Sequence, residues 1–333
     1  MFVKQRVHTA IRVAVVLAIA TLLLAISHSS VAGAETANTL KVSPVRTDTV
    51  VEAGATKTVQ TTVTNLTNAP ITVRPTVNDF VSGDERGTPA LILAEDEFAP
   101  SHSLKRFLSP IADVTIPAGQ AKTINVIVNV PSNAKPGGYF GAVRFSPTVG
   151  DSGGQVNLSP SVASLILLTV PGPVTEKLEI TRFDIQRDGA PAAHFLSSEG
   201  LTATVRFKND GDVQLGPFGK VSVKQGDKVV YEADFNNKDQ RDMILPGGAR
   251  IWDIPLEDIG EFGQYTVSAT FTYGQKNQTI EVTKSFWVIP PVAIIAVGVA
   301  LLVLIGAIVG FILYRRNSRH KRRMMRSHGH HRR

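Results

Sequence analysis

An apolar run near the C-terminus constrains this chain more than any other feature. Residues Val288–Leu313 contain no charged side chain, and a basic segment follows them directly. At about 1.5 Å per residue, roughly 20 helical residues cross the hydrocarbon core of a bilayer. Positively charged flanks stay on the cytoplasmic side. We therefore expect a transmembrane helix over 288–314, a basic cytoplasmic tail over 315–333, and an extracellular region before the helix.

The N-terminus has the three parts of a secretory signal peptide. A positively charged start precedes the apolar stretch Val13–Ile26, and Ala32-Gly33-Ala34 follows as a cleavage signature. The sequence predicts a signal peptide over 1–34. An uncleaved N-terminal anchor is the alternative, and it leaves the next region on the same side of the membrane.

The net charge of +7 describes the two ends of the chain rather than its centre. Nine of the 35 Lys and Arg lie in the tail and three in the signal segment, which leaves 23 basic residues against 28 acids between them. The extracellular region therefore has a net charge of −5. This balance argues against nucleic-acid binding. The basic tail can instead pair with anionic lipid head groups.

The residues offer little chemistry for catalysis. The chain has no Cys, and between the signal and the tail only His102 and His194 remain. No nucleophile elbow, zinc-protease motif, phosphate loop or dinucleotide fingerprint is present. The acids Glu95-Asp96-Glu97 are adjacent, and adjacent carboxylates rarely converge on one glycosidic bond. We predict no enzyme activity, no cofactor and no metal site; the histidines of the tail lack the other ligands that a metal site needs.

Alternation of apolar and polar residues, the pattern of half-buried strands, recurs through the extracellular region. It covers the segments Thr58–Val63, Ile71–Val77, Thr123–Val130 and Tyr139–Phe145. The segment Gly83–Pro110 interrupts the pattern, and we expect an irregular insertion there with one helical turn or a short edge strand. The fold class that follows is all-β.

An internal repeat divides this region. Thr62–Pro70 resembles Thr204–Asp212, since each is a strand that runs into an Asn-containing turn. Later elements follow in the same order: Val114–Gly119 corresponds to Met243–Gly248, and Gly138–Phe145 to Gly263–Phe271. The repeat predicts two immunoglobulin-like β-sandwich domains, over 39–172 and 174–287. Val170-Pro171-Gly172-Pro173 would end the first domain, because two prolines around a glycine stop a strand.

The string Lys135-Pro136-Gly137-Gly138-Tyr139-Phe140-Gly141 allows two interpretations. It can be a turn that feeds a strand, with Gly141 permitting close packing. It can also be an aromatic surface suited to stacking on a sugar or receiving a partner strand, with Tyr139, Phe140 and Gly141 as candidate binding residues. We expect Trp287, Arg315 and Arg316 at the membrane interface.

At these residues the chain resembles the bacterial WxL-interacting proteins. The landmarks are Val42-Ser43-Pro44, Asn65–Val73, Val114–Gly119 and Pro131–Gly141, and the resemblance covers roughly Leu40–Val170. Over Val174–Trp287 it rests on the order of elements. It implies a peptidoglycan-binding first domain, a host-binding second domain, one span and a short basic tail. The long acidic insertion departs from that pattern.

The sequence therefore predicts a non-enzymatic, single-pass cell-surface adaptor that binds cell-wall polymer (peptidoglycan), a secreted surface protein, or both. A structural or chaperone-like assembly module that acts by β-strand addition is the alternative. A wall-acting hydrolase is a third hypothesis. The oligomeric state does not follow from the sequence.

Overall fold

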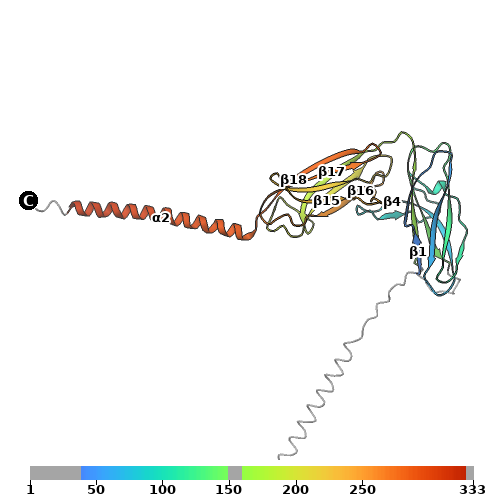
Figure 1. The fold of residues 1–333 in the computed structure, drawn as a ribbon, viewed down its shortest axis with the longest axis horizontal. Helices are drawn as coiled ribbons and strands as arrows, with labels where there is room; N and C mark the ends of the chain where they lie inside the picture. The colour runs from blue at the N-terminus through green and yellow to red at the C-terminus, as the bar shows by residue number, and fades with distance from the viewer. Residues whose placement is uncertain (1–38, 149–159, 328–333) are drawn as a thin grey trace, which may run out of the picture. The chain divides into compact units, whose positions relative to one another are not determined.

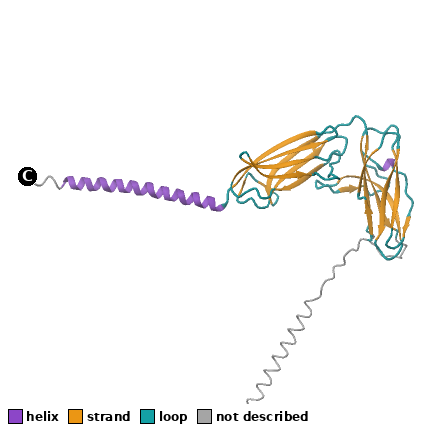
Figure 2. Ribbon diagram, in the orientation of Figure 1, coloured by secondary structure: helices purple, strands orange, loops and turns teal. Residues whose placement is uncertain are grey.

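The computed structural model describes residues 39–148 and 160–327 (Figures 1 and 2). These residues form mainly antiparallel β-strands, followed by one C-terminal helix. The mainly β character and the apolar helix expected from the sequence are confirmed. The predicted signal peptide lies outside the described residues.

Two sheets enclose the first hydrophobic core. The smaller sheet contains, in spatial order, β1 (Leu40–Ser43), β3 (Thr56–Asn65) and β7 (Ala121–Asn129). The larger contains β2 (Arg46–Val50), β9 (Val162–Val170), β8 (Gly137–Pro147), β4 (Ile71–Ser82) and β5 (Pro89–Leu91), with β6 (Val114–Ile116) also on β4. In β3 and β7 the buried residues alternate with more exposed ones, as in Val59, Ile124 and Val126. This period of two places one face of each sheet on the core.

Two further sheets enclose a second core. One contains β11 (Ala190–Pro191), β10 (Leu178–Arg187), β13 (Leu201–Asn209) and β16 (Ala249–Pro255). The other contains β12 (His194–Phe195), β18 (Gln278–Val288), β17 (Gly263–Tyr273), β14 (Phe218–Gln225) and β15 (Lys228–Phe235). Phe207, Phe235 and Phe271 meet at its centre, with ring centroids 4.8–6.1 Å apart. We call the two layered units the first and the second sandwich.

The same buried asparagine closes one end of each sandwich. Asn65 and Asn209 are fully buried at the ends of β3 and β13. Each amide donates to the carbonyl four residues later and to an isoleucine carbonyl of the following Pro-x-Gly segment, Ile116 or Ile244. Each side-chain oxygen accepts the N–H two residues later. The resemblance between Thr62–Pro70 and Thr204–Asp212 therefore corresponds to one hydrogen-bonded corner built twice.

The insertion over Gly83–Pro110 is predicted from the sequence to contain a helical turn or a short edge strand. It contains one of each, the strand β5 and one turn of 3₁₀-helix, η1 (Lys105–Phe107). The buried carboxylate of Asp79 organises it by accepting the N–H groups of Ala99 and Lys105 at 2.9 and 2.8 Å. The ammonium of Lys105 donates to the carbonyls of residues 94, 95 and 97. These bonds hold the loop onto β4.

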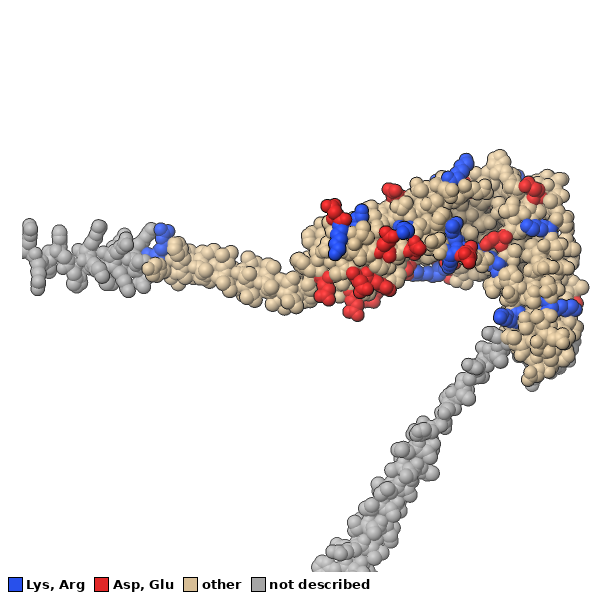
Figure 3. Space-filling view, in the orientation of Figure 1, with Lys and Arg blue, Asp and Glu red and all other residues tan. Residues whose placement is uncertain are grey.

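The helix α2 (Pro291–Ser327) follows β18 after a short turn. Its segment Pro291–Arg315 has 25 residues and a mean hydropathy of 3.2, so it is long and apolar enough to cross a membrane. At about 1.5 Å per residue it extends roughly 37 Å, somewhat more than the hydrocarbon core. Figure 3 shows no charged side chain on this segment before its C-terminal end.

Candidate functional site: a free strand edge and a pocket between the sandwiches

The outer edge of β18 carries backbone groups that bond to nothing else in the described chain. The N–H groups of Trp287 and Ile289 donate to the carbonyls of Ala193, just before β12, and of Phe195 in β12, away from β17. The direction of the backbone N–H and C=O groups alternates along a strand. In β18, these groups therefore point away from β17 at the odd-numbered residues. No hydrogen bond among the described residues reaches the outward backbone groups of 279, 281, 283 and 285. The segment Thr279–Ser285 is therefore a free edge.

The side chains along this edge suit an added strand. Ile280 and Val282 are partly buried and pack on the second core. An extended partner with alternating apolar residues would lie beside them and enlarge that core. On the outer face, Thr283 and Ser285 pair with hydroxyls of β17 at 3.4 and 3.0 Å. The edge begins beside an open groove of about 590 Å³ lined by residues 172–176 and 275–278.

The other sheet edges of the described chain are shorter or obstructed. A register shift interrupts the pairing of β10 with β13 and the pairing of β15 with β14. At the edge of β16, the N–H of Ile251 donates to the carbonyl of Glu85 in the first sandwich. Side chains of Lys57 and Gln240 donate to carbonyls of β2, and Leu108 bridges β7. Bulges, short strands, covering segments and charged side chains are the usual protections of an edge. Over Thr279–Ser285, β18 has only the charges of Glu281 and Lys284, and Lys284 is bonded to Asp184 of β10 at 3.3 Å.

A hairpin of the first sandwich joins the two sandwiches. The turn between β4 and β5 reaches β16, where the N–H of Ile251 donates to the carbonyl of Glu85 at 2.6 Å. The Glu85 carboxylate accepts two hydrogen bonds from Arg206, and Arg86 forms an ion pair with Asp253 at 2.6 Å. We call the contact of residues 82–89 with β13 and β16 the latch.

The electrostatics of the latch depend on ionised carboxylates. The hydrogen bond from Arg206 holds the pKa of Glu85 below its ordinary value. Burial alone would raise the pKa of Asp253, but hydrogen bonds from Thr204 and Arg86 and the charge of Arg86 lower it overall. Both side chains are therefore anionic near neutral pH, as the ion pairs require.

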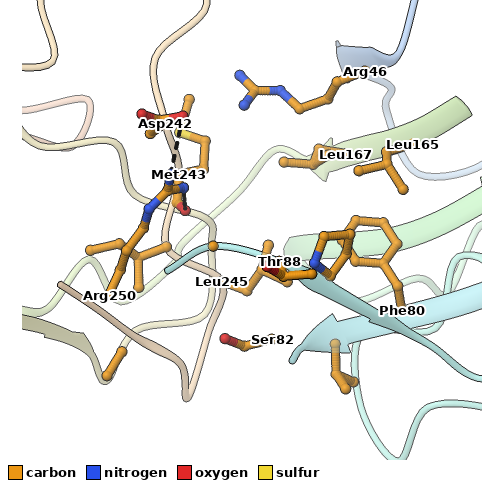
Figure 4. A pocket seen from close by; sticks show the side chains of 15 residues that line it. Arg46, Phe80, Ser82, Thr88, Leu165, Leu167, Asp242, Met243, Leu245 and Arg250 are labelled. Carbon is orange, nitrogen blue, oxygen red and sulfur yellow. Dashed lines mark hydrogen bonds and ion pairs between the residues drawn. The ribbon is translucent and has the colours of Figure 1, made fainter. Parts of the chain in front are cut away.

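A pocket of about 150 Å³ lies between the two sandwiches, beside the latch (Figure 4). Its apolar lining comes from both of them: Phe80, Leu165, Leu167, Met243 and Leu245. Charged side chains also line it: Arg46, Asp242 and Arg250. The guanidinium of Arg46 is held by Asp48 and by the carbonyl of Arg241, both at 2.8 Å. Arg250 lies against Asp242, at 3.3 Å, and over the ring of Trp252.

None of these pocket residues was predicted from the sequence. They come from β2, β4, β9 and the segment before β16, which lie far apart in the chain. The sequence of β9 is almost wholly apolar, which by itself is typical of a strand buried in its own domain. Leu165 and Leu167 instead face away from the first core and toward the second sandwich. No local motif marks such a face.

The predicted binding residues Tyr139, Phe140 and Gly141 lie inside the fold. They belong to β8, which is hydrogen-bonded to β4 on one side and β9 on the other, so β8 cannot receive a partner strand. Phe140 is buried against Phe80, with ring centroids 6.0 Å apart. A side chain at Gly141 would press on Leu104 at 3.0 Å. The packing of Phe140 and Gly141 fits the structural interpretation of this string, and partner binding at Tyr139, Phe140 and Gly141 stays a prediction.

Tyr139 and the histidines also have structural roles. The Tyr139 hydroxyl donates to the carbonyl of Lys135 at 2.8 Å, and burial raises the pKa of this side chain. Its ring packs on Phe107 with centroids 4.7 Å apart. His102 contacts the carbonyl of Gly138 through Nδ1 at 2.6 Å. Within the described ranges, no three His, Asp or Glu residues gather as metal ligands would.

The residues expected at the membrane interface lie on either side of the apolar segment. Trp287 is 39% exposed at the end of β18, where its N–H donates to the carbonyl of Ala193, just before β12. Arg315 lies over the ring of Phe311, one turn earlier on α2. Arg316 follows on the same helix, and its side chain lies outside the described part. Their contact with lipid stays a prediction.

No family model and no curated protein matches this chain. Among solved structures, the class 5 fimbrial chaperone CfaA has 12% identity and a TM-score of 0.38, over 75% of this chain and 99% of that one. The E. coli chaperone DraB has 17% identity and a TM-score of 0.33, over 75% of this chain and 96% of that one. A complex of the Salmonella enterica SafA pilin with the SafB chaperone has 12% identity and a TM-score of 0.33, over 75% and 95%. TM-scores this low do not establish a shared fold, so the proposals below rest on the strand pairing and contacts of this chain.

Proposed function

We propose that this protein is a non-enzymatic, membrane-anchored assembly module that binds a segment of another exported protein by β-strand addition. The observation that carries the proposal is the free edge of β18 over Thr279–Ser285. In strand addition, main-chain hydrogen bonds supply affinity and alternate side chains supply specificity. The edge offers both, since outward N–H and C=O groups alternate with the apolar rim of Ile280 and Val282.

We further propose that both sandwiches are immunoglobulin-like domains, over 39–172 and 174–287. The strand orders support this assignment. The first sandwich places strands one, two and five of an immunoglobulin domain in one sheet (β1, β3, β7), and the second does the same with β10, β13 and β16. The opposite sheets contain the remaining strands in the order β9-β8-β4 and β18-β17-β14-β15. This division agrees with the two sheets of immunoglobulin domains.

The anchor supports an extracellular position for the sandwiches. The apolar segment Pro291–Arg315 follows β18 closely, and basic residues follow it in turn. Positively charged flanks favour the cytoplasmic side. We propose a single-pass protein of the cell membrane, with the free edge outside and joined to the span by only a few residues.

The wall-polymer hypothesis draws less support from the contacts. The outward face of β3 and β7 is rich in Thr, Asn and Gln, which could bind sugar hydroxyls. Those side chains already bond across the strands: Thr62 with Thr123 at 3.0 Å, and Thr56 with Asn129 at 2.9 Å. A secreted surface protein, the other partner that the sequence suggests, fits a free strand edge. The resemblance to WxL-interacting proteins is compatible with such a partner and stays a prediction.

Site-specific crosslinking in native envelopes tests the proposal. The chain contains no Cys, so each introduced Cys is unique. We expect a photo-crosslinker on Thr283→Cys to capture another exported protein. The matched control is Thr270→Cys, which is exposed on the same face of the sheet but lies in β17, with both edges paired. Equal capture at both positions, or none at Thr283, would overturn strand addition at this edge.

A pair of proline variants separates the edge from the fold. Thr283→Pro removes an outward N–H and, toward β17, only the exposed hydroxyl contact with Ser268 at 3.4 Å and no backbone bond. The fold should therefore persist while binding weakens at least about fivefold, the equivalent of one hydrogen bond of about 1 kcal/mol. Val282→Pro removes a ladder bond opposite Ala269 and should disrupt the strand itself. Circular dichroism checks the fold, and crosslinking from Ser285→Cys measures binding. Undiminished capture in the Thr283→Pro background would contradict the proposal.

A further inference from the structure

The pocket between the sandwiches has the size of one side chain. Ligand sites for cofactors and drug-sized molecules span roughly 300–1,000 Å³, which is well above the 150 Å³ found here. An engineered apolar protein cavity of about 150 Å³ binds benzene. The pocket therefore matches one aromatic ring and is too small for a nucleotide, a haem or an oligosaccharide.

The lining also favours a ring. Phe80 and Leu167 are almost fully buried and form the apolar floor, and Leu165 and Leu245 are partly buried beside them. In Figure 4 the guanidinium of Arg46 lies above Leu167 and extends toward the side of the pocket that carries Asp242. Its hydrogen bonds to Asp48 and to the carbonyl of Arg241 use Nε and Nη2 and fix its position before any ligand arrives. A fixed guanidinium beside an apolar floor can lie over an aromatic face.

The polar rim distinguishes this pocket from a packing defect. Genuinely empty cavities are lined by apolar groups, whereas Ser82, Thr88 and Asp242 lie beside the apolar residues here. These side chains can bond to the backbone on either side of an inserted ring. Asp242 and Arg250 also balance each other's charge, so the rim does not demand a charged ligand.

We propose that this pocket is a second binding site, which accepts one phenylalanine or tyrosine side chain from an extended segment of a partner protein. Because the pocket is formed by both sandwiches, the inserted ring contacts Leu165 of the first and Leu245 of the second. The ring then bridges the sandwiches in the same way as the latch beside it. This site uses no residue of the β18 edge.

Methyl NMR on the full chain in detergent micelles tests this site. Four methionines are present in the sequence, and Met243 lines the pocket. A ¹³C-methyl label, assigned by loss of the signal in Met243→Leu, therefore reports on the pocket. We expect benzene, and a short Gly/Ser peptide with one Phe, to shift this signal saturably. The same peptide with Ala in place of Phe should not. The absence of a saturable shift with benzene and with the Phe peptide would overturn the proposal.

Two variants make the test specific. Leu165→Phe adds a ring at the pocket and should weaken binding of the Phe peptide at least about tenfold. Leu196→Phe makes the same change at an exposed position of the second sandwich and should leave binding unchanged. Equal affinity of both variants and the original chain would show that the ring binds elsewhere. Thr283→Pro should not alter the Met243 shift, so failure at the pocket and failure at the β18 edge can be told apart.

Discussion

Asn65 and Asn209 show how one amide can close the end of a β-sandwich. Each is fully buried. Its side-chain oxygen accepts the N–H two residues later, and its side-chain nitrogen donates to carbonyls of two separate segments. A carboxylate in the same position could accept but not donate. The resemblance of Thr62–Pro70 to Thr204–Asp212 therefore has a physical basis in the donor and acceptor pattern of asparagine.

Replacing Asn209 by Ala should destabilise the protein strongly. The change leaves the carbonyls of Val213 and Ile244 and the N–H of Gly211 without their partner. At about 1–3 kcal/mol for each buried unsatisfied group, the free energy of unfolding should fall by about 3–5 kcal/mol. Urea denaturation measures this difference. The exposed control Asn237→Ala should change it by less than about 0.5 kcal/mol; equal effects of the two variants would show that the buried amide has no such role.

The latch is one of several contacts that join the two sandwiches, beside the bonds of Arg46 to Arg241 and of Gly138 to Asp212. Its hairpin comes from the segment in which the strand pattern of the sequence breaks down, yet residues 82–89 make the backbone bond and ion pairs to the second sandwich. Residues from Leu40 onward accordingly group into a single compact unit. At Gly87 the φ of +94° favours glycine, and an added Cβ would also displace the guanidinium of Arg250.

Acidification should open the latch. Glu85 and Asp253 have folded-state pKa values below their ordinary 4.5 and 3.8. Their stabilisation is complete above those ordinary values and is lost as pH falls through the lowered ones. The N–H of Ile251, which donates to Glu85, should therefore exchange faster between about pH 5 and pH 2, relative to its intrinsic rate.

Hydrogen-exchange NMR measures that protection, with the amide of Val205 in the interior strand β13 as the reference. The double variant Glu85→Gln/Asp253→Asn cannot titrate at these positions, so its Ile251 protection should stay constant over the same range. A pH dependence that persists in the double variant would mean that other groups control the contact.

The strands were predictable because each depends on its own local pattern. The predicted segment Thr123–Val130 corresponds to β7, and Tyr139–Phe145 lies within β8. What local pattern could not reveal is which strands become central. Gly141 and Phe140 suggested an accessible surface, but β4 and β9 cover both edges of β8. The pocket was unpredictable for the same reason, since it needs the spatial order of strands that are distant in sequence.

At the scale of the whole molecule, charge and apolarity are separated along the chain. The described sandwiches mix acids and bases on their surface, while the apolar segment before Arg315 carries none (Figure 3). A basic segment then follows it to the C-terminus. The excess positive charge therefore lies in the ends of the chain, whereas Arg46 and Arg250 at the pocket and Lys284 at the free edge are each paired with an acid. Partner recognition at either site therefore depends on backbone bonds and apolar contact more than on long-range attraction.

The proposed orientation makes a direct prediction about accessibility. A membrane-impermeant maleimide added to intact cells should label Asn237→Cys, in the second sandwich, because this region lies outside. Ser318→Cys, beyond the apolar segment, should react only after the membrane is permeabilised, since the basic residues around it favour the cytoplasmic side. The Cys-free original chain provides the background. Labelling of Ser318→Cys in intact cells would reverse the topology, and the β18 edge and the pocket would then face cytoplasmic rather than exported partners.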